Sequence, residues 1–134
     1  MTDIIKIDIR TENYFEFIDI TAEIKKIVRS STEESGIAIV FTPHTTAGIT
    51  INENADPSVK SDITNFLMKN YTRESYFRHL EGNSPSHILS SIFSPSLTLI
   101  IDKGEIVLGT WQGIFFCEFD GPRERKIFVK IIEG

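Results

Sequence analysis

The alternation of apolar and polar residues predicts that the chain begins with two strands. Residues 4–10 and residues 14–20 both follow the two-residue period of a strand that is buried on one face. Glu12 and Asn13 form a turn-like interval between them. We therefore expect the two strands to pair as a hairpin.

Further strands are expected where short apolar runs are bounded by turn residues. These runs are residues 37–41, 48–51, 96–101, 105–108, 111–119 and 126–132. The turn between residues 96–101 and 105–108 is Asp102-Lys103-Gly104.

Three segments between the strands have the spacing of amphipathic helices. Residues 22–34 carry apolar side chains at that spacing, with Thr21 as the expected N-cap and Gly36 beyond the end. Two later helices are expected to start at Asp56-Pro57 and Ser84-Pro85, where a capping side chain precedes a proline suited to the first helical turn. Strands at both ends with helices between them indicate an α+β fold.

Composition and charge fit one globular domain. The chain has 134 residues, of which 40% are hydrophobic, and this is enough for a single core. The formal net charge of −5 argues against nucleic-acid binding. We expect a cytoplasmic protein without a membrane span, because the sequence has no basic leader before an apolar segment and no apolar run near 18 residues.

Two basic groups and one cysteine are expected to have no chemical role. Lys25-Lys26 and the group of Arg123, Arg125 and Lys126 are predicted to be solvated. Cys117 lies in an apolar run, so we expect a small buried side chain rather than a nucleophile.

The three histidines are the leading candidates for chemistry. His44 follows a strand end, and His79 and His87 flank the turn that contains Glu81. Imidazole is the commonest protein ligand of zinc, and three protein ligands with one open position are typical of catalytic zinc. Their spacing is no recognised zinc signature, so two alternatives stay open: catalytic or hydrogen-bonding histidines without a metal, and unrelated surface histidines.

A loop rich in amide and carboxylate side chains is a second candidate. It contains Asn52, Asn54 and Asp56. A helix cap explains Asp56, whereas two asparagines exceed the need of one turn. Direct ligand contact and ordinary capping are both kept as interpretations.

The two proline-started helices are candidate sites for a phosphorylated ligand, because a helix N-terminus presents N–H groups and partial positive charge. The turn over residues 84–87, with the hydroxyls of Ser84 and Ser86 beside His87, forms the better anion site. Asp56 makes the other helix start suitable for a divalent metal on a phosphorylated substrate. Ordinary capping without a ligand is the alternative for both.

Trp111 and Gln112 stand between two glycines. Glycines let the backbone approach a ligand or another chain closely. Trp111 is expected either to stack on a flat heterocycle or to anchor the core or an interface.

Four segments together resemble the YjbQ-like family, whose members are described as secondary thiamine-phosphate synthases. The similarity runs from about residue 36 to residue 132, and Gly-Thr-Trp-Gln-Gly is its most specific part. The segments are His44-Thr-Thr-Ala47, Asn52-Glu-Asn-Ala-Asp-Pro57, Glu81-Gly82 with His87, and Leu108-Gly-Thr-Trp-Gln-Gly113.

The resemblance implies a fold, an assembly and a site. The fold would be one compact domain over residues 1–134, with a mixed, largely antiparallel sheet or sandwich and about three helices packed on it. The assembly would be a homotrimer, with a pocket near the subunit boundaries. A divalent metal, commonly zinc, would be bound, and the candidate ligands are His44, His79 and His87.

The resemblance also implies a transferase that joins a pyrimidine diphosphate to a thiazole phosphate and releases pyrophosphate, with magnesium as a further candidate cation. Catalytic roles would fall to His44, Asp56, Glu81 and His87. Substrate contacts would fall to Asn52, Asn54, Asn83, Ser84, Trp111 and Gln112. Two other functions stay open: a zinc-dependent hydrolase of a small phosphorylated metabolite with Glu81 as general base, and a non-catalytic trimeric metabolite-binding module.

Overall fold

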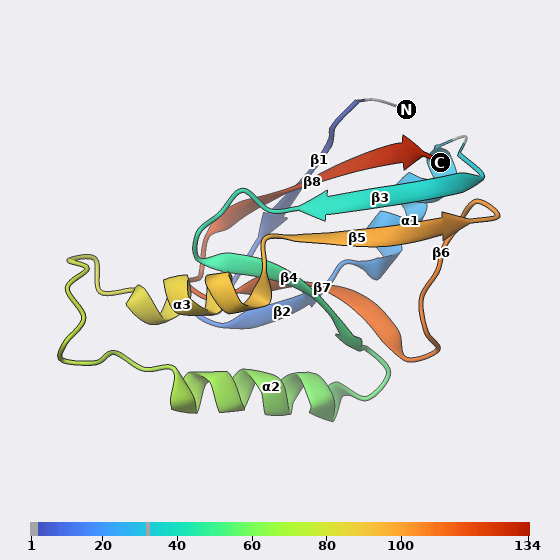
Figure 1. Cartoon of the computed structure of the whole chain (residues 1–134). Helices are drawn as coiled ribbons and strands as arrows, with labels where there is room; N and C mark the ends of the chain where they lie inside the picture. The colour runs from blue at the N-terminus through green and yellow to red at the C-terminus, as the bar shows by residue number, and fades with distance from the viewer. Residues whose placement is uncertain (1–2, 32) are drawn as a thin grey trace.

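The structure, a computed structural model that describes residues 3–31 and 33–134, contains eight strands in that part of the chain. They are β1 (Ile5–Arg10), β2 (Glu16–Asp19), β3 (Ser35–Phe41), β4 (Ala47–Glu53), β5 (Ser96–Asp102), β6 (Glu105–Ile106), β7 (Gln112–Glu118) and β8 (Glu124–Glu133). The larger sheet has the order β1-β8-β3-β5-β6 and the smaller sheet the order β2-β7-β4. Every strand pair is antiparallel, which confirms the predicted largely antiparallel α+β fold (Figure 1).

The first two strands do not form the predicted hairpin. β1 pairs with β8, with Ile7 opposite Ile127, whereas β2 pairs with β7 in the other sheet, with Phe17 opposite Cys117. The reason is that the two strands pack in different cores: Ile7 packs between the sheets, and Phe17 packs in a separate aromatic cluster. Alternation therefore identified each strand but not its partner.

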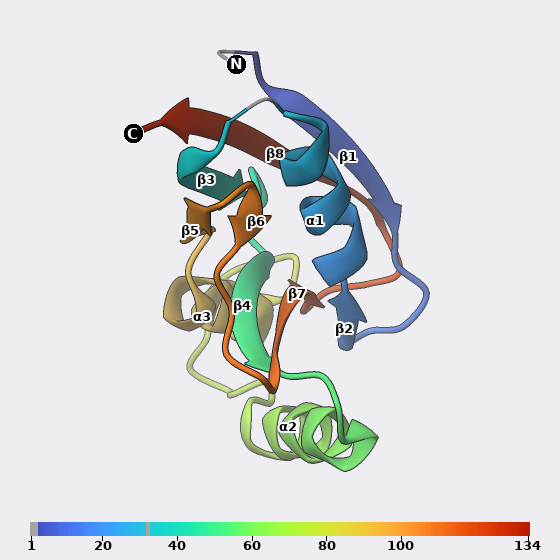
Figure 2. The same ribbon diagram turned by 90° about the vertical axis from the view of Figure 1, so that its right-hand side faces the viewer.

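Three helices cover the sheets in the described part of the chain: α1 (Thr21–Ser30), α2 (Pro57–Asn70) and α3 (Ser84–Phe93). Figure 2 shows α1 and α3 on opposite sides of the smaller sheet. Asp56 caps α2 as predicted, because its side chain accepts a hydrogen bond of 2.9 Å from the N–H of Ser58. None of these helices is long and apolar enough to cross a membrane.

Two other helix boundaries differ from the prediction. Thr21 is the first residue of α1 and not its cap, and its hydroxyl accepts a hydrogen bond of 2.9 Å from the N–H of Ile114. α1 is shorter than predicted because the backbone at Ser31 is already extended. Asn83, and not Ser84, occupies the N-cap position of α3.

Two hydrophobic clusters hold the elements together. The first lies between the two sheets and α1, and the second, which is largely aromatic, lies between the smaller sheet and the helices α2 and α3. Cys117 belongs to the second cluster and is fully buried, and burial raises the pKa of its thiol well above the ordinary value. The interpretation of Cys117 as a small core residue is confirmed.

α2 is only loosely attached to the rest of the chain. Its apolar side chains include Val59, Ile63, Phe66 and Leu67, but only Leu67 is buried, and Phe66 is 62% exposed. Figure 1 shows α2 running outside the smaller sheet, beyond α3.

Candidate functional site

β4 separates the candidate residues into two groups. His44 lies shortly before the first residue of β4, and Asn54 and Asp56 lie shortly after its last residue. The strand has seven residues, so its two ends lie about 20 Å apart at roughly 3.3 Å per residue. One chain therefore presents two polar sites, one at each end of β4.

The first site is a polar pocket of about 270 Å³ at the start of β4, called here the His44 pocket. It lies where the β3–β4 connection, the start of α3 and the start of β8 meet. Its lining residues are Pro43, His44, Thr45, Thr46, Glu81, Asn83, His87, Arg123 and Arg125. The structure thus brings together three of the four predicted catalytic residues.

The ring of His44 is held against β8. Its Nε2 accepts a hydrogen bond of 2.9 Å from the backbone N–H of Lys126. Burial lowers the pKa of His44 from its ordinary value of 6.5, and the positive charge of Arg125 lowers it further. His44 is therefore neutral at pH 7, with its proton on Nδ1 because Nε2 acts as the acceptor.

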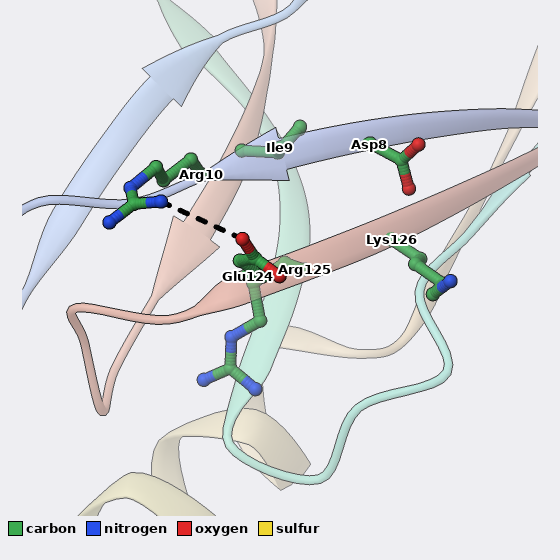
Figure 3. A pocket seen from close by; sticks show the side chains of 6 residues that line it. All are labelled: Asp8, Ile9, Arg10, Glu124, Arg125 and Lys126. Carbon is green, nitrogen blue, oxygen red and sulfur yellow. Dashed lines mark ion pairs between the residues drawn. The ribbon is translucent and has the colours of Figure 1, made fainter.

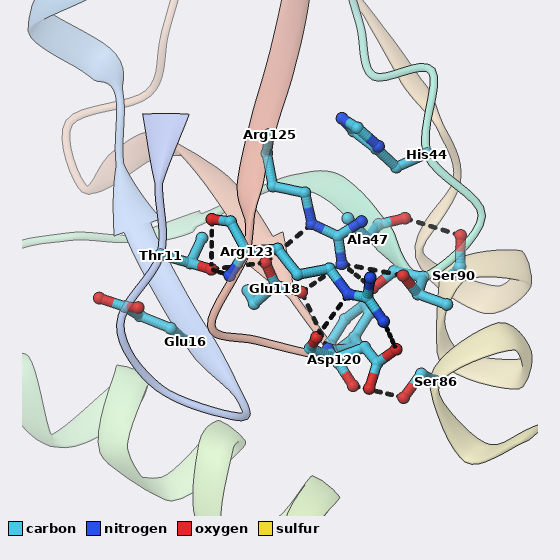
Figure 4. Close-up of polar contacts among 12 residues, drawn as sticks. Thr11, Glu16, His44, Ala47, Ser86, Ser90, Glu118, Asp120, Arg123 and Arg125 are labelled. Atoms are coloured by element: carbon cyan, nitrogen blue, oxygen red, sulfur yellow. Dashed lines mark hydrogen bonds and ion pairs between the residues drawn. The ribbon is translucent and has the colours of Figure 1, made fainter. Parts of the chain in front are cut away.

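A buried ion pair lies beneath the pocket (Figure 4). Glu118 is fully buried, and Arg125 is 4% exposed. The Glu118 carboxylate accepts hydrogen bonds from both Nε and Nη2 of Arg125, and Nη2 also donates to the hydroxyl of Thr46 at 2.8 Å. The predicted solvated position of Arg125 is wrong, because this strand residue points inward and finds a buried carboxylate there.

The opposite wall of the pocket is a network of carboxylates around Arg123. The Nη2 atom of Arg123 lies 2.8 Å from a carboxylate oxygen of Asp120 and 3.3 Å from one of Glu81. The amide of Asn83 donates to both carboxylates, at 2.8 Å and 3.1 Å. Asn83 and Glu81 are thus fixed at the pocket, as the sequence suggested for this turn.

His79 and His87 contact each other edge to face, with ring centroids 5.2 Å apart. His87 lines the His44 pocket, whereas His79 is exposed and does not. No group of three histidine, cysteine, aspartate or glutamate side chains is arranged to hold a metal within the described residues. Nε2 of His44 accepts a hydrogen bond from Lys126, and of the three histidines His44 and His87 line the pocket.

The second site lies at the end of β4, around Asn54. Its side-chain amide donates to Asp19 at 3.1 Å, and both residues line a small hollow of about 90 Å³ with Asp56 and Lys60. The hydrogen bonds from Thr21 offset the desolvation of Asp19 and lower the pKa of this carboxyl. Asn52 points outward, and its oxygen accepts a hydrogen bond from the N–H of Glu53.

The glycine-flanked segment borders this second site. Asn54 donates its backbone N–H to the carbonyl of Trp111, and a Cβ on Gly113 would meet the Asn54 side chain at 2.4 Å. Gly113 is therefore required for the position of Asn54. Gln112 closes the segment on itself by accepting the N–H of Gly109, and Trp111 is 62% exposed, so it is not a core anchor.

A third hollow, of about 410 Å³, lies over β1 and β8 (Figure 3). Its charged residues alternate in sign, and Arg10 and Glu124 pair across it at 3.6 Å while both remain more than 80% exposed. An exposed pair of this kind adds little to stability. The two charges compensate each other, and no histidine lines this hollow.

The chain is therefore a small α+β protein with two antiparallel sheets. Its polar site, the His44 pocket, lies between the start of β4 and the start of α3. The chain belongs to the family described as UPF0047 protein YjbQ-like, whose model matches residues 5–134.

Relatives extend over nearly the whole chain. A UPF0047 protein of Methanocaldococcus jannaschii is 56% identical over 95% of this chain and 92% of its own length. The UPF0047 protein YugU of Bacillus subtilis is 46% identical over 94% of this chain and 96% of its own length.

Solved structures show the same fold. A crystal structure of an uncharacterised YjbQ/UPF0047 protein from Clostridium acetobutylicum is 54% identical, with a TM-score of 0.92 over 96% of this chain and 99% of that one. A protein of unknown function from Sulfolobus solfataricus is 31% identical, with a TM-score of 0.93 over 100% and 99%. The α+β fold is therefore shared across the family.

Proposed function

We propose that the His44 pocket is the active site of a transferase for small phosphorylated metabolites, with thiamine-phosphate synthesis as the first reaction to test. The observation that carries this proposal is the convergence of two imidazoles, one carboxylate and two guanidinium groups on one pocket. A small polar pocket with acid–base groups and cations suits a substrate whose leaving group is a phosphate or diphosphate.

In this reaction the C–O bond between the pyrimidine methylene and the diphosphate breaks. The thiazole nitrogen forms the new C–N bond, and pyrophosphate leaves. The exposed carboxylate of Glu81 would stabilise the cation that develops on the methylene. His87, which lines the same pocket, would protonate the departing pyrophosphate, and the Nδ1–H of neutral His44 would donate a hydrogen bond to it.

The test is a measurement of thiamine phosphate formed from the two substrates with added magnesium. We expect His44→Gln and His87→Gln to lose about 100-fold or more of the activity, the usual contribution of one acid–base group. His79→Gln is the matched control, because this histidine is exposed and lies outside the pocket. No product from the parent protein, or equal losses in all three variants, would overturn the proposal.

The zinc-dependent hydrolase is the second candidate, and metal content separates the two. Elemental analysis of protein purified without added metal, beside the same three variants, gives a direct comparison. Near-stoichiometric zinc that disappears in all three variants would favour the hydrolase and make His79 a ligand. Protein without zinc in every sample would leave the histidines as acid–base groups.

The homotrimer belongs to the same proposal. What supports self-association is the outer face of the larger sheet, where apolar side chains remain uncovered in the single chain. The six apolar residues of this outer face are Ile37, Ile39, Phe41, Ile100, Phe128 and Ile132. Assembly would also give the exposed Trp111 and the second site a neighbour, in line with a pocket near the subunit boundaries.

A further inference from the structure

Arg125 has an incompletely used guanidinium group. Nε and Nη2 are bound to Glu118 and Thr46, as described above. Nη1 has no hydrogen-bond partner among the described residues. It is still accessible to solvent, because it is not among the fully buried side-chain atoms that lack a partner. In Figure 4, Nη1 carries no dashed line and points toward the side on which His44 lies.

The surroundings of Nη1 favour an anion. Arg125 lines the His44 pocket together with Asn83, the N-cap residue of the ten-residue helix α3. The positive end of the α3 dipole therefore faces the same space. His44 is nearby and neutral, so it adds a hydrogen-bond donor without a competing charge.

Arg123 is a weaker candidate for the same role. It is half exposed, and the carboxylates of Asp120 and Glu81 both lie against its Nη2. Two adjacent negative charges would repel an incoming anion, and solvent screens the remaining attraction. The single carboxylate beside Arg125 is Glu118, which lies behind the guanidinium and is fully buried.

We propose that Nη1 of Arg125 is the anchor of an oxyanion subsite in the His44 pocket, and that this subsite binds one tetrahedral phosphate group. Glu118 and Thr46 are the positioning residues, because they hold the guanidinium plane in one orientation before any ligand arrives. The proposal rests on the proposed function for the source of the anion, which would be a phosphate of the substrate or product.

The experiment uses inorganic phosphate as the probe and the full chain as the protein. Isothermal titration at pH 7.5 is carried out on the parent protein, on Arg125→Lys and on the matched control Arg29→Lys, an exposed arginine that pairs with Glu105 outside the pocket. We expect Arg125→Lys to weaken phosphate binding about tenfold or more, because lysine cannot keep the bonds to Glu118 and donate into the pocket together. Arg29→Lys should change it less than threefold.

A second measurement covers the case in which Arg125→Lys fails to fold. Arginine side-chain ¹H–¹⁵N spectra of the parent protein are recorded during the same phosphate titration. The Arg125 resonances should shift with the titration while those of Arg29, outside the pocket, stay nearly constant. Unchanged Arg125 resonances, or equal loss of affinity in both variants, would overturn the subsite.

The experiments distinguish a failure of the subsite from a failure of the proposed reaction. Phosphate binding that depends on Arg125, in a protein without transferase activity, would retain the subsite and reject the reaction. Transferase activity that is unaffected by Arg125→Lys would retain the reaction and reject the subsite.

Discussion

Glu118 and Arg125 form the buried ion pair beneath the His44 pocket, and this pair gives a direct prediction about stability. Replacing Glu118 by Gln would leave a guanidinium of 4% exposure without its counter-charge. We expect the free energy of unfolding to fall by about 3–5 kcal/mol, as for other buried pairs that lose one partner. Urea unfolding followed by circular dichroism measures this change.

The exposed pair of Arg29 and Glu105 serves as the control for this prediction. Both side chains are more than half exposed, and their N–O distance is 3.0 Å. Glu105→Gln should therefore change the free energy of unfolding by less than about 1 kcal/mol. Similar losses in the two variants would mean that Glu118 is not specially buried.

The ring of His44 should titrate below its ordinary value of 6.5. The unfolded chain then binds a proton at a higher pH than the folded chain does, so the stability contributed by neutral His44 is complete above pH 6.5. It is lost as the pH falls from 6.5 toward the folded-state pKa. The C2–H resonance of His44, followed by NMR against pH, measures the midpoint; a midpoint at or above 6.5 would contradict the burial of the ring against Lys126.

Single residues differ in how far the sequence predicts their role. His44, Glu81, Asn83 and His87 were identified from their polar local context, and they meet in one pocket. Arg125 was missed because its neighbours Glu124 and Lys126 are charged and exposed, which is typical of a solvated surface. The inward-pointing position of a basic residue in β8 was the only available signal, and the buried partner on β7 is not visible from sequence spacing.

At the scale of elements, α2 should be the least stable helix of the chain. Leu67 is its one buried residue in the aromatic cluster, and Ile63 packs against the cluster only partly buried. Leu67→Ala should lower the free energy of unfolding by about 2–5 kcal/mol through cavity formation. Phe66→Ala, at a position that is 62% exposed, should change it by less than about 0.5 kcal/mol.

Hydrogen exchange gives a second measurement of the same element. Backbone amides of α2 should exchange faster than those of β7, because a helix with few buried contacts opens locally without unfolding of the sheets. Equal protection of α2 and β7 would show that α2 is covered by contacts outside the single chain.

The sequence predicts the individual strands and helices well, but it predicts the pairing of strands poorly. Every strand and helix of the described chain coincides with a predicted segment, because local periodicity and proline-started helices are strong signals. The hairpin of β1 and β2 was wrong, since strand partners depend on which core each apolar face enters. The same limit applies to the site: β4 holds its two polar ends apart, although their sequence separation is small.

At the scale of the whole molecule, the outer face of the larger sheet is the surface through which we expect copies of the chain to associate. The other face of β3 is buried at Ala38 and Val40, so this strand is apolar on both faces. A strand with one solvated face alternates apolar with polar residues, whereas strands covered on both faces are continuously apolar. In the proposed homotrimer, we expect a second copy of the chain to cover the outer face of the run Ile37 to Phe41.

Ile100→Lys would place a charge on this face at a side chain that is 60% exposed in the single chain. We expect size-exclusion chromatography with light scattering to report a trimer for the parent protein and a monomer for the variant, because a buried lysine without a partner strongly disfavours association. Met68→Lys, on the outside of α2, is the control and should leave the assembly intact. A monomeric parent protein would mean that the apolar outer face has another partner, and that each chain carries its two polar sites separately. A trimer that survives Ile100→Lys would move the interface away from this sheet and toward the exposed Trp111 at the end of β4.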